Sequence, residues 1–282
     1  MHDVYLSLGT NLGDRAANLA EAKRLLADKL GTVPTFVSSG VIETEPVDVP
    51  EEFAALKFLN EMILVKTEKG PYEVSEIVHK IEDEMGRIRT VKNGPRVIDI
   101  DIIAYDDLVL DDPILTLPHP RAMERSFVLT PWKNLIRSEM KRKRAKLSPE
   151  RRDRASHEIC EILVSELDDA KKICAYEAFK TELDLSEFIE FCRAQGREVI
   201  FPEKCGNEYV VEGASEVDLW ICPGLAFSER GDRVGFGGGW YDRFLAKAKS
   251  GSRKLGVAYS FQIIPFVPSG SHDIKLDKVI SC

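Results

Sequence analysis

The stretch Val97-Ile98-Asp99-Ile100-Asp101-Ile102-Ile103 places two aspartates inside a run of β-branched apolar residues. Such a run predicts a β-strand, in which alternate side chains point to opposite faces. Both carboxylates then share one face, with Cα atoms about 7 Å apart at ~3.3 Å per residue. At that separation they repel by roughly 2 kcal/mol at an effective dielectric constant of ~20. A divalent cation would relieve the repulsion, and oxygen-only ligands are typical of Mg²⁺.

Four cations precede this aspartate pair. Gly86-Arg87-Ile88-Arg89 carries two arginines, and Lys92 and Arg96 flank the turn signal Asn93-Gly94-Pro95. Phosphoryl transfer needs such a combination, because metals bridge phosphate oxygens and arginines neutralise developing charge. The alternative interpretation is a pair of surface salt bridges on an edge strand, and the pattern alone leaves both open.

Composition narrows the class of protein. The chain has 282 residues, of which 44% are hydrophobic and 30% charged, as in a soluble globular protein with room for two domains. The net charge of −8 argues against general nucleic-acid binding, and no apolar stretch is long enough to span a membrane. We expect no signal peptide and a cytoplasmic location. All six cysteines follow residue 150 without CxxC spacing, which suits buried thiols in a reducing compartment.

The first half of the chain is expected to alternate strands and helices. Apolar alternation predicts strands over 4–8, 33–44, 59–67 and 97–105, and helical spacing predicts helices over 15–30 and 72–85. Asp14 is placed to cap the first helix. The resulting βαββαβ-like order predicts an antiparallel α+β sandwich, followed by a turn-rich segment over 106–125.

Composition changes near residue 132. Ten Lys or Arg residues lie between 133 and 154, and Lys133, Arg137 and Lys141 share one helical face. We interpret this stretch as a solvated helix face rather than a nucleic-acid patch, given the negative net charge. Beyond it, strands are expected over 173–176, 198–201, 218–222, 255–259 and 278–280. Helices over 148–167, 185–195 and 240–249 complete the pattern of a three-layer α/β unit.

A second chemical signal is the glycine-rich stretch Gly231-Asp232-Arg233-Val234-Gly235-Phe236-Gly237-Gly238-Gly239, which leads directly into a predicted helix. Glycine lets backbone N–H groups approach a ligand, and the helix N-terminus attracts anions, so the stretch predicts a phosphate-binding loop. It is neither a Walker loop nor a dinucleotide fingerprint, and a flexible turn is the alternative. Arg233 and Asp242 favour the phosphate-binding interpretation, and Asp242 and Asp273 could share a metal.

The first 132 residues resemble the 6-hydroxymethyl-7,8-dihydropterin pyrophosphokinase family. The resemblance rests on residues 5–12, 58–60, 82–101 and 118–127, and above all on 94–101, GPRVIDID, which is similar to the family's signature. It implies a ferredoxin-like α+β sandwich. It also implies transfer of the terminal diphosphate of ATP to the pterin hydroxymethyl group, with release of AMP.

The resemblance further implies roles for individual residues. The catalytic residues would be Arg87, Arg96, Asp99 and Asp101, of which the two aspartates hold Mg²⁺. ATP would be bound by Glu82, Arg89, His119 and Arg125. The pterin would be bound by Thr44, Val47, Phe58, Asn60 and Phe127, with the heterocycle between two aromatic rings.

Residues 133–282 resemble the 5-formyltetrahydrofolate cyclo-ligase family at residues 223–227, 231–245 and 268–277. The resemblance implies a three-layer, Rossmann-like α/β/α domain and ATP-dependent conversion of 5-formyltetrahydrofolate to 5,10-methenyltetrahydrofolate. ATP would be bound by Lys133, Arg137, Arg233, Gly235, Gly237, Gly238, Gly239 and Tyr241. Glu182 would bind the folate, and Asp242 and Asp273 would hold Mg²⁺.

The sequence therefore predicts a two-domain α/β protein, with domains over 1–132 and 133–282. We expect a bifunctional folate enzyme that uses MgATP, a pterin and a reduced folate, with no nucleic-acid or membrane partner and an open oligomeric state. Only fifteen residues, 203–217, stand where the cyclo-ligase family usually has a longer segment. An active pterin kinase whose second half only binds nucleotide or acts as a scaffold is therefore the alternative. RNA binding through 133–154 is a third, less favoured hypothesis.

Overall fold

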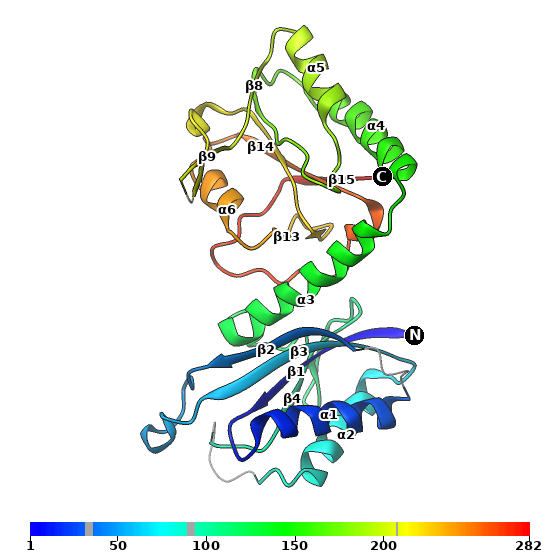
Figure 1. Ribbon diagram of the computed structural model, residues 1–282, viewed down its shortest axis with the longest axis vertical. Coiled ribbons are helices and arrows are strands. Elements are labelled where there is room, and N and C mark those ends of the chain that lie inside the picture. Colours follow the sequence, from blue (N-terminus) through cyan, green and yellow to red (C-terminus); the bar gives the residue numbers. More distant parts are fainter. Residues whose placement is uncertain (32–35, 89–93, 207) are drawn as a thin grey trace. The chain divides into compact units, whose positions relative to one another are not determined.

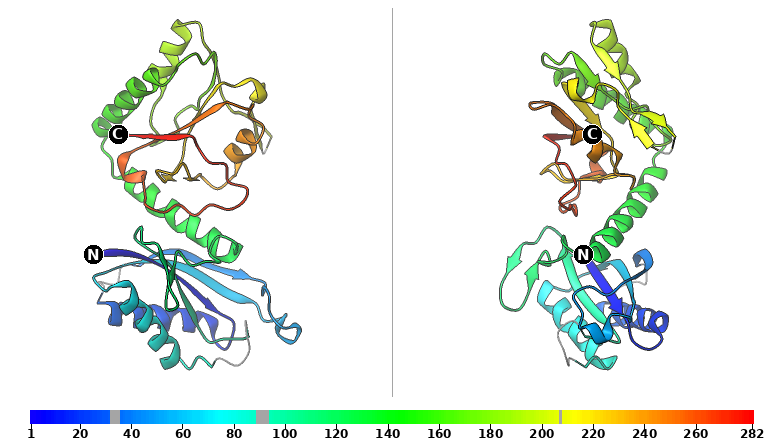
Figure 2. Two further views of the ribbon diagram at one scale, coloured as in Figure 1. Left: turned by 180° about the vertical axis from the view of Figure 1, so that it is seen from behind. Right: turned by 90° about the vertical axis from the view of Figure 1, so that its left-hand side faces the viewer.

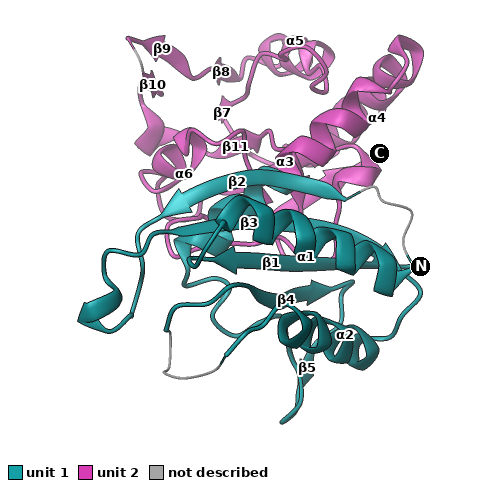
Figure 3. Cartoon of the chain, turned by 60° about the horizontal axis from the view of Figure 1, so that its bottom comes forward, with its two compact units in different colours: residues 1–135 teal, residues 136–282 magenta. Residues whose placement is uncertain are grey.

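The computed structural model describes residues 1–31, 36–88, 94–206 and 208–282. The chain divides into two compact units, unit 1 over residues 1–135 and unit 2 over residues 136–282 (Figure 3). Each unit combines helices with a β-sheet, so the mixed α/β, two-part organisation expected from the sequence is confirmed. The division falls inside one helix, α3 (Ser126–Ala145), which also contains the predicted boundary after residue 132.

Unit 1 is built on a four-stranded antiparallel sheet (Figure 1). The chain passes through β1 (His2–Thr10), α1 (Arg15–Leu30), β2 (Val37–Thr44), β3 (Phe58–Thr67), α2 (Pro71–Glu84) and β4 (Asp99–Tyr105). The strand order β2-β3-β1-β4 puts β1 inside the sheet and β4 at an edge. Both helices cover the same face of this sheet. A short 3-10 helix, η1 (Glu51–Phe53), and the strand pair β5 (Leu110–Asp111) and β6 (Thr116–Leu117) complete the secondary structure before α3.

The core of unit 1 lies between the sheet and its two helices. Leu6 of β1, Leu26 of α1 and Ile81 of α2 are completely buried there, and each such side chain contributes roughly 1.5–3 kcal/mol. The predicted cap of α1 is confirmed, because the Asp14 side chain accepts a hydrogen bond from Ala17 N at 3.0 Å.

The alternation predicted for the aspartate strand is confirmed. Ile98, Ile100 and Ile102 belong to the core, whereas Asp99 and Asp101 are half-buried on the other side of β4. In the ladder with β1, Asp99 lies opposite Gly9 and Asp101 opposite Ser7. The sheet face that is turned away from the helices therefore carries two carboxylates beside small residues.

Unit 2 contains a five-stranded parallel sheet, with the order β15-β14-β11-β7-β8 (Figure 2). Its strands are β7 (Lys172–Cys174), β8 (Glu198–Ile200), β11 (Leu219–Cys222), β14 (Arg253–Ala258) and β15 (Lys278–Ser281). Its helices are α4 (Pro149–Ser165), α5 (Ser186–Ala194) and α6 (Trp240–Leu245).

Helices cover both faces of this sheet. Leu219 and Ile221 of β11 pack in one apolar cluster with residues of α4 and α5, whereas Trp220 and Cys222 pack in another with residues of α6. Since neighbouring strand residues enter different clusters, the sheet lies between two helical layers.

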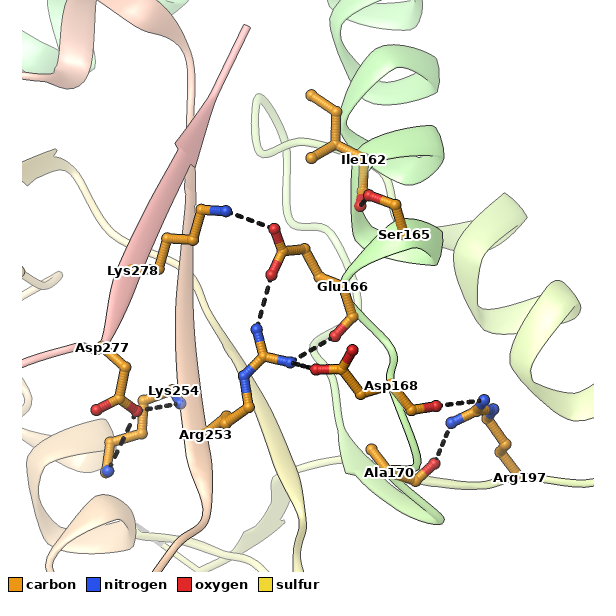
Figure 4. Close-up of polar contacts among 10 residues, drawn as sticks. All are labelled: Ile162, Ser165, Glu166, Asp168, Ala170, Arg197, Arg253, Lys254, Asp277 and Lys278. Carbon is orange, nitrogen blue, oxygen red and sulfur yellow. Dashed lines mark hydrogen bonds and ion pairs between the residues drawn. The ribbon is translucent and has the colours of Figure 1, made fainter.

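Ion pairs connect Glu166, at the end of α4, to the sheet of unit 2 (Figure 4). The Glu166 carboxylate accepts from Arg253 Nη2 at 2.7 Å and from Lys278 Nζ at 2.5 Å, so one acid joins the helix end to β14 and β15. These hydrogen bonds, first from Lys278 and then from Arg253, lower the pKa of Glu166.

Several short elements were not predicted. They are the strand pairs β5 with β6, β9 (Glu203–Cys205) with β10 (Glu208–Val210) and β12 (Ala226–Phe227) with β13 (Arg233–Val234), and the 3-10 helices η1, η2 (Ala214–Glu216) and η3 (Ser260–Gln262). Two or three residues are too few for an alternation pattern to be read. The helix predicted over 240–249 ends at Leu245, where turn hydrogen bonds such as Lys247 N to Phe244 O replace the helical ladder.

Candidate active site

A cavity of about 430 Å³ opens on the face of the unit 1 sheet that is turned away from the helices. Ser7 and Gly9 of β1 and Asp99 and Asp101 of β4 line it. Their strand neighbours are core residues, and alternate residues of a strand point to opposite faces. The cavity therefore lies on the carboxylate side of the sheet.

Ten residues predicted from the sequence meet in this cavity. They are Thr44, Val47, Phe58, Asn60, Arg87, Arg96, Asp99, Asp101, Arg125 and Phe127. Glu82 and His119 are not among its lining residues, and Arg89 lies outside the described residues. The lining residues that sequence reasoning missed are Ser7, Gly9, Glu45, Val49, Ile88, Gly94, Pro95 and Arg121. Six of these, Ser7, Gly9, Ile88, Gly94, Pro95 and Arg121, fall inside the motif blocks recognised in the sequence, and that position was the signal available for them.

One part of the cavity offers an amide and two aromatic rings. Asn60 is 4% exposed, and its Nδ2 donates to Thr44 Oγ1 at 2.8 Å, which fixes the orientation of the amide. A Cβ atom on Gly9 would lie 3.1 Å from Asn60 Oδ1, so glycine leaves room for this amide. The rings of Phe58 and Phe127 lie on the cavity wall. An oriented amide beside aromatic faces suits a flat, polar heterocycle.

Guanidinium groups cover these rings in the structure. The Arg96 guanidinium lies 5.5 Å from the centre of the Phe58 ring, and that of Arg125 lies 5.4 Å from the centre of the Phe127 ring. Such cation–π contacts are weak at partly exposed sites, about 0.5–1 kcal/mol each. An incoming ligand can therefore displace them at little cost.

The aspartate pair has the electrostatics of a cation site. Burial, followed by the charge of Asp99, raises the pKa of Asp101 to about 7, although Arg125 and Arg87 act in the opposite direction. No cation forms an ion pair with Asp101 within the part of the chain that the structure describes. A half-buried carboxylate that is costly to ionise, beside a second one, fits a divalent cation with oxygen ligands.

Two arginines neutralise the other carboxylate. Asp99 Oδ1 lies 2.6 Å from Arg87 Nη1, and Asp99 Oδ2 lies 2.5 Å from Arg96 Nη1. Asp99 thus forms the ion pairs on an edge strand that the alternative interpretation predicted. It does so inside the cavity and next to Asp101, so these pairs and a cation site are compatible.

Glu82 lies beneath this arrangement rather than on its surface. It is 2% exposed, its carboxylate pairs with Arg87, and Oε1 accepts from Ile100 N at 2.8 Å. Ile100 lies between the two aspartates. Glu82 therefore fixes both an arginine of the cavity and the strand that carries the carboxylates.

His119 is held as a neutral imidazole. Desolvation, followed by the charges of Arg125 and Arg121, lowers its pKa. Its Nδ1 lies 3.2 Å from Arg121 N, a backbone donor, so Nδ1 acts as an acceptor. The remaining proton of a neutral ring is then on Nε2, which is available as a donor.

The glycine-rich stretch of unit 2 surrounds a buried arginine. Arg233 is 7% exposed, and its Nη2 lies 3.2 Å from Asp242 Oδ1. The Tyr241 ring lies 5.4 Å from its guanidinium, and Arg233 Nη1 donates to Pro223 O at 3.3 Å. Arg233, Tyr241 and Asp242, predicted to act together, are therefore neighbours.

Other predicted residues of unit 2 lie around the same loop. Arg137 Nε donates to Gly235 O at 2.8 Å, and Gly237 has a positive φ of 113° that favours glycine. Asp273 Oδ2 accepts from Gly270 N at 2.6 Å. Within the described residues, no group of three or more acidic, histidine or cysteine side chains forms a metal cluster. A metal shared by Asp242 and Asp273 stays a prediction. Lys133 belongs to unit 1.

Glu182 lines a separate cavity of unit 2, about 660 Å³ in volume. Tyr176, which follows β7, and Phe201, which follows β8, line it as well. Burial raises the pKa of Glu182, whose carboxylate accepts from Phe179 N at 2.9 Å. The carboxyl ends of parallel strands are the usual place for ligands in such sheets.

Comparison with known proteins decides the family of the first half. Residues 5–137 match the family model for 7,8-dihydro-6-hydroxymethylpterin-pyrophosphokinase. Over 128 residues the chain is 40% identical to the 2-amino-4-hydroxy-6-hydroxymethyldihydropteridine pyrophosphokinase of Bacillus subtilis, which covers 45% of this chain and 74% of that protein. The chain belongs to this pyrophosphokinase family. The corresponding enzyme of Methylorubrum extorquens is also 40% identical over 132 residues, 46% of this chain and 80% of its own length.

The second half matches a different family. Residues 203–282 match the model of the 5-formyltetrahydrofolate cyclo-ligase family. A solved structure of a 5,10-methenyltetrahydrofolate synthetase from Mycoplasma pneumoniae is 28% identical, with a TM-score of 0.49 over 52% of this chain and 97% of that one. Both resemblances seen in the sequence are confirmed by family matches, that of the second half over residues 203–282. None of the described helices has the length and apolar character needed to cross a membrane.

Proposed function

We propose that unit 1 transfers a diphosphate group from MgATP to the hydroxymethyl group of 6-hydroxymethyl-7,8-dihydropterin and releases AMP. The observation that carries the proposal is one cavity with two chemically different parts. Asn60 and the aromatic rings suit a pterin, and the aspartate pair with its arginines suits a metal-bound triphosphate. Pyrophosphokinase relatives that are 40% identical support the same reaction.

The pterin is expected to bind through Phe58, Phe127 and Asn60. Its ring faces would replace the guanidinium groups that now cover the two phenylalanines, and the Asn60 amide would pair with its polar edge. Thr44 keeps the amide in one orientation because its Oγ1 accepts from Asn60 Nδ2. This arrangement fixes the hydroxymethyl group relative to the phosphates, which is the main source of rate in phosphoryl transfer.

The phosphates are expected to bind to Arg87, Arg96 and Arg125, together with Arg89. Asp99 and Asp101 would hold Mg²⁺, which would supply positive charge to the phosphates. Arg87 and Arg96 would then exchange their pairs with Asp99 for pairs with phosphate oxygens, which bind guanidinium groups in two-pronged fashion. His119 would donate from Nε2, a role for a neutral imidazole rather than an acid or base.

Measurement of AMP release from ATP, with and without 6-hydroxymethyl-7,8-dihydropterin, tests the proposal. Asp99→Ala is expected to lower pterin-dependent AMP release more than tenfold, a change of ~1.4 kcal/mol or more. Asp111→Ala, which removes an exposed carboxylate of the same unit, is the matched control. Absence of pterin-dependent AMP from the wild-type protein would contradict the proposal, and retention of more than a tenth of the rate by Asp99→Ala would contradict the metal role.

We also propose that unit 2 uses ATP to convert 5-formyltetrahydrofolate to 5,10-methenyltetrahydrofolate. The formyl oxygen would take the γ-phosphoryl group, leaving ADP, and attack by N10 would then expel phosphate as the ring closes. Arg233, the glycine backbone and Tyr241 would hold the phosphates, Asp242 and Asp273 would hold Mg²⁺, and Glu182 would bind the folate. The match of residues 203–282 to the cyclo-ligase family supports this activity.

The alternative is a unit 2 that binds nucleotide without turnover. It is favoured by the short segment 203–217, whose described residues form the strand pair β9–β10 and the 3-10 helix η2. An assay for the methenyl product, formed from 5-formyltetrahydrofolate and ATP, distinguishes cyclo-ligase activity from binding without turnover. Arg233→Ala is the test variant, and Arg230→Ala, at an exposed arginine, is its control. Product at the background rate with the wild-type protein would exclude cyclo-ligase activity and leave the binding role.

The finer fold assignments are proposals of the same kind. The order β2-β3-β1-β4 with two helices on one face supports a ferredoxin-like class for unit 1. The all-parallel ladder of unit 2 supports a Rossmann-like class. The domain limits 1–132 and 133–282 and the cytoplasmic location stay predictions.

A further inference from the structure

Arg121 is a cation of the unit 1 cavity that the sequence did not single out. Arg121 lines the cavity and is exposed. Among residues 1–31, 36–88, 94–206 and 208–282, no carboxylate forms an ion pair with it. Arg87 and Arg96 differ in this respect, because both pair with Asp99. Arg121 is therefore a cation whose charge no acid compensates in this structure.

The backbone at Arg121 is held in a hydrogen-bonded turn. Its N–H donates to His119 Nδ1 at 3.2 Å, and Ala122 N donates to His119 O at 3.0 Å. Glu124 N donates in turn to Arg121 O at 3.3 Å, and Ala122 is completely buried. The guanidinium thus extends from a fixed point on the cavity wall rather than from a loose loop.

The surroundings of Arg121 are positive. Burial first, and then the charge of Arg121, lowers the pKa of Arg125; burial and the charges of Arg125 and Arg121 lower the pKa of His119. Four arginines and three acids line the same cavity. Of the acids, Glu45 pairs with Lys57 at 2.6 Å, Asp99 pairs with two arginines, and Asp101 is left to the proposed Mg²⁺ site. A concave surface with uncompensated positive charge attracts anions and raises their rate of association.

We propose that Arg121 is a phosphate-binding residue that captures the triphosphate of ATP. The inference rests on the proposed function of unit 1 and adds a residue to it. Guanidinium is suited to this role because its fork of donors matches phosphate oxygens. Arg87 and Arg96 must break their ion pairs with Asp99 before they can bind phosphate. Arg121 has no such pair to break, so it can bind the phosphates first. We therefore expect Arg121 to increase the affinity for ATP and to have little effect on the rate of the chemical step.

Steady-state kinetics of the full-length protein test this role. Arg121→Gln is expected to raise the KM for ATP about tenfold and to change kcat less than threefold. Arg121→Lys should restore part of the affinity because it keeps the charge. The matched control is Arg24→Gln, which removes an exposed arginine of α1 paired with Glu21. Added salt should weaken ATP binding less in Arg121→Gln than in the wild type.

A binding measurement without pterin separates this inference from the proposed reaction. Protection of the β4 amides and the 119–125 turn from hydrogen exchange, followed as MgATP is added, reports on unit 1 alone. The midpoint should move about tenfold to higher ATP in Arg121→Gln. If the wild-type protein makes no AMP but this shift occurs, the proposed reaction fails and the phosphate-binding role stands. Midpoints and KM values within twofold of the wild type, in a variant with unchanged circular dichroism, would overturn the role of Arg121.

Discussion

Replacing Asp101 with Asn is expected to stabilise unit 1 and to abolish its kinase activity. Burial and the neighbouring Asp99 raise the pKa of the Asp101 carboxyl from its ordinary 3.8 to about 7. At ~1.4 kcal/mol per pKa unit, this difference corresponds to ~4 kcal/mol of folding free energy once the carboxyl is ionised. Asn has nearly the same shape and no charge. The gain is at most ~4 kcal/mol, because a buried amide must itself find hydrogen-bond partners.

The sign of the pH dependence follows from the direction of the pKa change. The folded protein keeps the Asp101 proton up to about pH 7, whereas the unfolded chain loses it near its ordinary value of 3.8. Between these values the folded state binds more protons, so the free energy of unfolding falls as the pH rises and levels off above about pH 7. The advantage of Asp101→Asn should therefore be small near pH 4 and largest above pH 7.

Hydrogen exchange of the β1 and β4 amides, with a chelator present, measures the stability of unit 1 directly. Wild type, Asp101→Asn and the exposed-site control Asp111→Asn would be compared at acidic, neutral and mildly alkaline pH. Other groups titrate in the same way in all three proteins, so their effects cancel when the free energies of unfolding are subtracted at each pH. A variant that is no more stable than the wild type above pH 7, or an advantage that does not change with pH, would refute the reasoning. Pterin-dependent AMP release by Asp101→Asn should fall more than tenfold in the same preparations.

Three further predictions concern single side chains. Glu82→Gln should lower kcat for AMP release at least tenfold with little change in the KM for pterin, because an amide forms no ion pair with Arg87. Steady-state kinetics test this, and a kcat near that of the wild type would show that the ion pair is unimportant. Gly9→Ala should raise the KM for pterin severalfold and leave the KM for ATP unchanged, since its methyl would meet Asn60 Oδ1 at 3.1 Å; equal changes in both constants would argue against this local effect. Gly231→Ala should destabilise unit 2 by ~2 kcal/mol or more, because φ is +86° and its Cβ would lie 2.1 Å from a backbone carbonyl oxygen; an unchanged unfolding profile in scanning calorimetry would contradict it.

The geometry of the aspartate pair could be predicted because a strand has only two faces. Once Ile98, Ile100 and Ile102 were assigned to the core, Asp99 and Asp101 had to share the other side. The start of α1 followed from an equally local signal, the Asp14 cap. Structural features that neighbouring residues determine could therefore be predicted from the sequence.

The partners of the charged residues could not be predicted in this way. The sequence predicted that Arg87 and Arg96 bind phosphate, but in the structure both form ion pairs with Asp99. Arg87 also pairs with Glu82, which lies on the core side of β4. These pairs depend on where α2 and the following segment lie against the sheet. That placement is a result of tertiary packing, which neighbouring residues in the sequence do not encode.

Arg121 shows a different limit. It stands in the same recognised block as His119 and Arg125, yet nothing in its local sequence distinguishes a cavity-lining arginine from a solvated one. Only the turn at 119–125, the cavity lining and the lack of an acid partner among the described residues reveal the difference. Very short strands such as β12 and β13 were not predicted either, since two residues are too few to show an alternation pattern.

The helix α3 has a practical consequence for anyone who wishes to study the two halves apart. Unit 1 ends and unit 2 begins within it, and Trp132, Leu135, Ile136 and Met140 are buried along its length. No linker exists at this junction for a protease or a cloning site to exploit, and a cut there would leave each fragment with a severed helix and apolar side chains in water. Separate expression would succeed better with overlapping fragments that both retain residues 126–145.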